Sequence, residues 1–135
     1  MILTIDTYAW IEILRDSPRA RIALTAIEAA ERCLTPSVVL AEFASECVRD
    51  GFRDELILAE LAAIHESSDV VPIDSSIALG AARALEELRN AAKVRKIGVP
   101  GLGDAIVLAT ARREGASILT GDPHFSPLPE TVWIG

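Results

Sequence analysis

Four acidic residues beside apolar segments are the first candidates for chemistry in this sequence. Asp6 follows an apolar run at residues 2–5, and Asp122 follows another at residues 118–121. Asp104 lies at the start of an apolar helical stretch, and Glu42 interrupts an apolar run that extends on both sides of it. Carboxylates at such places contribute little to packing. Several of them together are suited to bind a hard divalent cation such as Mg²⁺, which prefers oxygen ligands.

Each acid alone also has an ordinary structural explanation. Asp6 could cap the helix that follows it, and Asp104 could be a favourable charge at a helix start. Asp122 could be a turn residue before Pro123, and Glu42 could lie on a solvated helix face. Because coincidence at all four positions is much less probable than at one, we interpret the four acids as one metal site.

Short apolar runs alternate with segments of helical periodicity along the chain. We expect strands at residues 2–5, 33–35, 70–73, 118–121 and 131–134, and helices that start near residues 7, 18, 37, 53, 77 and 104. This alternation is typical of a parallel sheet that helices cover on both faces. Sites in such sheets form beyond the carboxyl ends of strands, at a switch in strand order, and Asp6 and Asp122 are predicted at such ends.

Length and composition bound the class of protein. The 135 residues suit one domain, which we place at residues 1–135. No apolar stretch is long enough for a membrane span, and no basic region precedes Ile2 as in a secretory signal. Cys33 and Cys47 have no CxxC spacing and no accompanying His pattern, so we interpret them as reduced, partly buried thiols. These features predict a cytoplasmic protein without a membrane partner.

The net charge of −7 excludes binding of nucleic acid by bulk electrostatics. Binding to RNA or DNA would require a metal and a local basic patch. The densest basic cluster lies in or beside a loop predicted at residues 93–103, and its members are Arg89, Lys93, Arg95 and Lys96. The cluster could guide RNA phosphates, or it could be a solvated helix end that the helix dipole favours, and the sequence leaves both open.

Other polar and aromatic residues receive more ordinary interpretations. Thr7 and Thr120 are either hydrogen-bond donors to a carboxylate or phosphate, or plain residues at the ends of elements. His124 is interpreted as a surface turn residue, and Trp10 and Trp133 as core residues because both lie in apolar-periodic segments.

Taken in order, the acidic segments resemble the motifs of the PIN-domain nucleases, and most closely those of VapC-type toxins from prokaryotic toxin–antitoxin pairs. The matching segments are Ile5-Asp6-Thr7, Leu40-Ala41-Glu42-Phe43, Gly103-Asp104-Ala105 with Ala109-Thr110-Ala111, and Leu119-Thr120-Gly121-Asp122-Pro123-His124-Phe125. Each motif is short, but four in the right order along the chain make a specific signal. Residues 93–99, which are basic and contain a glycine, match no expected motif.

The resemblance implies a PIN-like three-layer α/β sandwich with a short parallel sheet of four or five strands flanked by helices. It implies a metal-dependent endoribonuclease with Mg²⁺ as cofactor and Mn²⁺ as a substitute, in which Asp6, Glu42, Asp104 and Asp122 are catalytic. Asp6, Asp104 and Asp122 are the expected metal ligands, and Glu42 either binds through water or orients the attacking water. RNA is the implied substrate, a cognate antitoxin protein the implied partner, and a homodimer the implied assembly.

Two alternatives belong to other functional classes. The first is a metal-dependent phosphohydrolase on a similar sheet. A phosphatase of the haloacid dehalogenase type would need a second Asp two residues after Asp6, where this chain has Tyr8. The second is a non-catalytic PIN-like binding module, which the loss of one acid would favour, whereas this sequence keeps all four.

Overall fold

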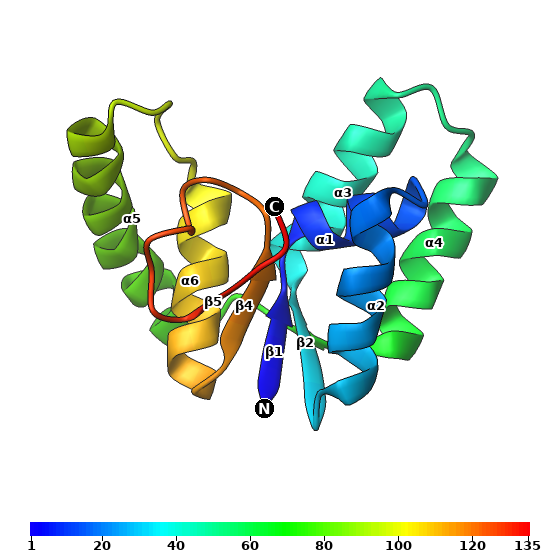
Figure 1. Cartoon of the computed structure of the whole chain (residues 1–135), viewed down its shortest axis with the longest axis horizontal. Coiled ribbons are helices and arrows are strands. Elements are labelled where there is room, and N and C mark those ends of the chain that lie inside the picture. Colours follow the sequence, from blue (N-terminus) through cyan, green and yellow to red (C-terminus); the bar gives the residue numbers. More distant parts are fainter.

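Five short parallel strands form a sheet between two layers of helices (Figure 1). The computed structural model describes residues 1–135. In the order in which they lie in the sheet, the strands are β3 (Asp69–Val71), β2 (Arg32–Pro36), β1 (Ile2–Ile5), β4 (Ser117–Thr120) and β5 (Thr131–Trp133). All four neighbouring pairs are parallel. This confirms the predicted α/β sandwich, with five strands.

Six helices connect these strands and form the two outer layers. Two helices follow each of the first three strands: α1 (Thr7–Leu14) and α2 (Pro18–Ala29), α3 (Ser37–Arg49) and α4 (Asp54–Ser67), and α5 (Ser75–Arg95) and α6 (Leu102–Glu114). The chain moves outward from β1 to β3 and then returns across the sheet to β4. Because crossovers between parallel strands are right-handed, this reversal puts α5 and α6 on the face opposite α1 to α4 (Figure 1).

Because of this reversal, β1 and β4 are direct neighbours in the sheet. The chain continues from β1 toward β2 on one side and from β4 toward β5 on the other. Ile5 pairs with Leu119, and the amide of Asp6 donates to the carbonyl of Leu119 at 3.2 Å. The carboxyl ends of the two strands therefore lie side by side at the switch in strand order. Open α/β sheets form their binding sites at such a place.

The core is aliphatic and holds the helix that carries Asp104. Strand residues such as Leu3, Ile5 and Leu119 are at most 1% exposed, as expected for a sheet covered on both faces. Every residue of α6 from Ala105 to Ala111 is buried. A Cβ at Gly80 of α5 would lie 3.3 Å from the Cβ of Ala109, so α5 and α6 pack closely. This packing fixes the first turn of α6, where Asp104 lies.

Some details differ from the sequence-based expectations. The loop predicted at residues 93–103 spans only 96–101, because α5 continues to Arg95 and α6 begins at Leu102. Trp10 is buried, as predicted, and donates its indole N–H to Thr35 Oγ1 at 3.2 Å. Trp133, predicted in the core, is 45% exposed, because β5 is an edge strand that has a neighbour on one side only.

The two cysteines lie in the interior of the protein. Cys33 and Cys47 are free and buried, and burial raises the pKa of both thiols. No helix combines the length and the apolar character needed to cross a bilayer.

Candidate metal centre

The four acids line a single cavity of about 630 Å³ at the carboxyl edge of the sheet. We call Asp6, Glu42, Asp104 and Asp122 the acidic site. Each comes from a different part of the chain: Asp6 follows β1, Glu42 lies on α3, Asp104 lies in the first turn of α6, and Asp122 follows β4. The fold therefore gathers residues that are up to 116 positions apart, from Asp6 to Asp122.

Asp6 is the most deeply buried acid and is turned toward the other acids. It occupies the position before α1, but its side chain makes no capping hydrogen bond, so the capping interpretation is wrong. Its Oδ2 instead accepts from Thr120 Oγ1 at 2.7 Å, and the residue is only 4% exposed. The pKa of Asp6 is raised to about 7: burial is the largest cause and the charges of Asp104 and Asp122 add to it, while the Thr120 hydrogen bond opposes the rise.

The Thr120 hydroxyl ties two of the acids together. It donates to Asp6 and accepts from the backbone amide of Asp122 at 3.0 Å. Thr120 is fully buried at the end of β4, so this hydroxyl has a fixed position. Of its two interpretations from sequence, the donor to a carboxylate is the one that the structure supports.

Asp122 and Asp104 each make a local hydrogen bond to the backbone and also line the cavity. Asp122 Oδ1 accepts from the backbone amide of His124 at 2.9 Å, as a turn residue does. Asp104 Oδ2 accepts from the amide of Gly101 at 3.1 Å, at the start of α6. Both carboxylates still face the cavity, so their ordinary roles and a metal site coexist. Burial raises the pKa of Asp104, and the charge of Asp122 adds to the rise.

Glu42 points from α3 into the same cavity. Its Oε1 accepts from Thr7 Oγ1 at 3.0 Å, so the interpretation as a solvated face residue is wrong. A Cβ on Gly103 would lie 2.9 Å from Glu42 Cδ, so the absence of a side chain at Gly103 gives the carboxylate its space. Burial raises the pKa of Glu42, the charges of Asp104 and Asp122 add to the rise, and the Thr7 hydrogen bond opposes it.

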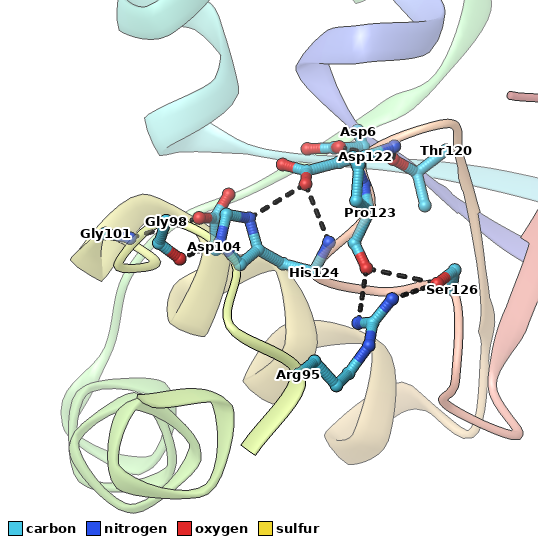
Figure 2. A network of polar contacts seen from close by, with 10 residues as sticks. All are labelled: Asp6, Arg95, Gly98, Gly101, Asp104, Thr120, Asp122, Pro123, His124 and Ser126. Atoms are coloured by element: carbon cyan, nitrogen blue, oxygen red, sulfur yellow. Dashed lines mark hydrogen bonds and ion pairs between the residues drawn. The ribbon is translucent and has the colours of Figure 1, made fainter. Parts of the chain in front are cut away.

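His124 belongs to this site, although its sequence context indicates only a surface turn. Its Nδ1 lies 2.9 Å from Asp122 Oδ1, and its Nε2 lies 2.6 Å from the carbonyl oxygen of Gly98 (Figure 2). A carbonyl can only accept, so Nε2 carries a proton, and a proton on Nδ1 would donate to the carboxylate. Burial alone would lower the pKa of His124, but its contacts with Gly98 and Asp122 outweigh burial and raise it. Its position two residues after Asp122 was the available sequence signal.

The donor set fits a divalent cation such as Mg²⁺ or Mn²⁺. Carboxylate oxygens predominate, and one ligand atom each from Asp104, Asp122 and His124 lie within 4.8 Å of one another. No Lys or Arg forms an ion pair with any acid of the site. Crowded carboxylates that have no Lys or Arg partner are stabilised by a bound cation.

Comparisons with known proteins agree with this architecture. A sequence model described as PIN domain matches residues 3–130. A search of curated proteins found no match.

Solved structures with the same fold include several toxins and toxin–antitoxin complexes. A toxin–antitoxin complex from Klebsiella pneumoniae has 20% identity, coverage of 98% of each chain and a TM-score of 0.70. VapC20 from Mycobacterium tuberculosis, described as a sarcin-ricin loop cleaving toxin, has 18% identity, coverage of 94% of this chain and 95% of that chain, and a TM-score of 0.72. VapBC2 from Rickettsia felis, bound to a promoter DNA fragment, has 17% identity, coverage of 98% and 97%, and a TM-score of 0.71. At these identities the likeness shows the fold.

Proposed function

This chain belongs to the PIN domain family, and from that premise we propose that it is a metal-dependent endoribonuclease resembling the VapC-type toxins. The observation that carries the proposal is the convergence of Asp6, Glu42, Asp104 and Asp122 in one cavity at the switch in strand order. The description of the Mycobacterium tuberculosis relative as a cleaving toxin supports a cleavage activity.

We assign the ion to Asp6, Asp104 and Asp122, with Mg²⁺ as cofactor and Mn²⁺ as its substitute. When bound, the ion would offset phosphate charge and lower the pKa of an attacking water. Thr120 holds Asp6 and the backbone of Asp122 in register, so these two acids need little reorganisation to bind. Residues 1–135 would form a single PIN domain around this site.

Glu42 is the group that we assign to the water. Thr7 occupies its Oε1, and its Oε2 has no hydrogen-bond partner within the protein. A general base works best with a pKa near the working pH, and the raised pKa of Glu42 moves it in that direction. The alternative role, binding the ion through a water, uses the same free oxygen.

The proposed partners follow from the family and from the relatives. Solved structures with this fold include complexes of a toxin with its antitoxin, which supports a cognate antitoxin for this chain. A homodimer is the assembly that we propose on the basis of the resemblance to VapC-type toxins.

A panel of substrates tests the proposed reaction. We expect the protein to cleave single-stranded RNA in Mg²⁺ or Mn²⁺, and to lose that activity in excess EDTA, because the acids alone cannot offset phosphate charge. Single-stranded DNA and p-nitrophenyl phosphate serve as parallel substrates. Hydrolysis of the phosphomonoester alone would indicate a phosphohydrolase, and RNA binding without cleavage would indicate a binding module. Cleavage of RNA in excess EDTA would contradict the proposed mechanism.

A further inference from the structure

The loop at residues 96–101, between α5 and α6, lies beside the acidic site. The carbonyl oxygen of Gly98 lies 2.6 Å from His124 Nε2, and the amide of Gly101 donates to Asp104 Oδ2 at 3.1 Å (Figure 2). The backbone of one short loop therefore contacts two residues of the site. Whatever binds on the outer side of this loop lies next to the candidate metal centre.

The outer side of the loop borders a second cavity, of about 450 Å³. Its lining combines cations with apolar side chains: Arg89, Lys93, Lys96, Ile97, Val99 and Pro100. We call this cavity the basic groove. Val99 is 79% exposed, so an apolar surface is open to solvent beside the charges. No acid lines the groove.

The three cations of the groove are free to bind a ligand. None of them forms an ion pair or a side-chain hydrogen bond within the protein. Arg89 and Lys93 are four residues apart and share one side of the end of α5, and Lys96 follows directly after the helix. A groove lined by three unpaired cations and no acid matches an extended polyanion.

Arg95, unlike the other members of the basic cluster, makes side-chain hydrogen bonds within the protein. Its guanidinium donates to the carbonyl of Pro123 at 2.7 Å and to Ser126 Oγ at 2.9 Å (Figure 2). Arg95 thus joins the end of α5 to the turn that follows Asp122. The four basic residues of the cluster therefore divide into one structural link and three cations that line the groove.

We propose that the basic groove binds the single-stranded RNA flank next to the phosphodiester held at the acidic site. This rests on the ribonuclease function proposed above. Cations that follow the backbone and apolar side chains that contact bases and sugars are the usual components of a single-strand site. An acidic protein segment would also match the cations, but the loop that lines the groove also contacts His124 and Asp104 beside the metal centre, where a phosphodiester is the expected ligand.

The test measures RNA binding in an Asp6→Asn background, which prevents cleavage. The variant carries Arg89→Ala, Lys93→Ala and Lys96→Asn; Asn is chosen because Lys96 has a left-handed backbone, with φ of 57°. The control replaces Arg21, Arg53 and Arg83 with Ala. These arginines are exposed and unpaired, line neither the acidic cavity nor the groove, and give the same change in net charge.

We plot the logarithm of the RNA association constant against the logarithm of the salt concentration. The slope for the groove variant should be shallower by about 2 than the slope for the protein with the intact groove, since each phosphate contact on a single strand contributes about 0.7. When salt is raised from 50 to 200 mM, the protein with the intact groove should lose affinity for RNA by a factor ~20-fold larger than the factor lost by the variant. The control should keep a slope near that of the intact groove. With Asp6 restored, the groove variant should show a raised KM for long RNA and an unchanged kcat, because the groove does not touch the reacting atoms.

The outcomes separate the two proposals. If the parent cleaves RNA and the groove variant has the slope and KM of the control, the groove proposal is overturned and the ribonuclease stands. If the parent binds no RNA, both are overturned. Polyglutamate is tested in parallel, and if only its binding depends on the three residues, the groove receives an acidic protein segment and the RNA proposal is wrong. Melting temperatures of the variants show whether a loss of binding reflects loss of the fold.

Discussion

Asp6→Asn is expected to reduce kcat for RNA cleavage by at least ~10²–10³-fold at neutral pH and saturating Mg²⁺. Asn has the shape of Asp, and its amide oxygen can still accept from the Thr120 hydroxyl that now bonds Oδ2. The fold should therefore persist while the site loses one negative charge at its most buried position. The measurement is single-turnover cleavage of a defined single-stranded RNA.

Asp69→Asn is the matched control for this substitution. Asp69 is an exposed acid at the start of β3, paired with Arg32 at 2.8 Å and absent from the acidic cavity. Exposed ion pairs contribute little to stability, so this variant should cleave at the parent rate. Equal rates for Asp6→Asn and Asp69→Asn would remove Asp6 from the mechanism.

The metal-free protein is expected to lose stability as the pH rises from 5 to 8.5. The pKa of Asp6 rises from its ordinary value of 3.8 to about 7 on folding, so the folded state binds the proton more tightly than the unfolded state. This contribution to the free energy of unfolding is fully present below pH 3.8 and is lost as the pH rises through 7. The whole effect amounts to up to ~4 kcal/mol, of which ~3 kcal/mol is lost between pH 5 and 8.5.

Between pH 5 and 8.5, the other groups with shifted pKa values either lower the free energy of unfolding as the pH rises or leave it unchanged. The pKa values of Glu42, Asp104 and His124 are all raised, so their contributions also disappear as the pH rises. Asp74 and Glu87 have lowered pKa values, and their favourable contributions are already complete near pH 5. The sign of the pH dependence in this window is therefore set by the acidic site.

Melting curves in EDTA at pH 5 and pH 8.5 measure this effect. A loss of ~3 kcal/mol corresponds to a fall of roughly 10 °C in the parent, and Asp6→Asn should show a much smaller fall because its amide does not titrate. Mg²⁺ should raise the melting temperature of the parent more at pH 8.5 than at pH 5, since it binds deprotonated carboxylates of the folded state. If Asp6→Asn falls as far as the parent and responds equally to Mg²⁺, the buried carboxylate at position 6 is not the titrating group.

The placement of the acids could be predicted from sequence because it depends on local periodicity and on the topology of parallel sheets. The direction of the Asp6 side chain could not. A capping aspartate and a metal-binding aspartate occupy the same backbone position before α1, and the partner that decides between them, Thr120, is 114 residues away. The role of Glu42 depends in the same way on contacts with Thr7 and with the bare backbone of Gly103.

His124 and Arg95 show a second limit of sequence reasoning. The partner of His124 Nε2 is the backbone carbonyl of Gly98, and that of Arg95 Nη1 is the backbone carbonyl of Pro123. Any residue type offers a carbonyl, so no motif records these contacts. They depend on where the loop at residues 96–101 and the turn after β4 meet in space. The exposure of Trp133 likewise follows from its edge strand and not from its periodicity.

Anomalous scattering from crystals soaked with Mn²⁺ shows whether Asp6, Asp104 and Asp122 hold a divalent ion. We expect a Mn²⁺ peak within about 2–2.5 Å of an Asp6 oxygen and of an oxygen from Asp104 or Asp122. The peak should weaken or disappear in Asp6→Asn crystals soaked in the same way. Mn²⁺ bound elsewhere, with these three side chains apart and free of metal, would show that they do not form the metal site.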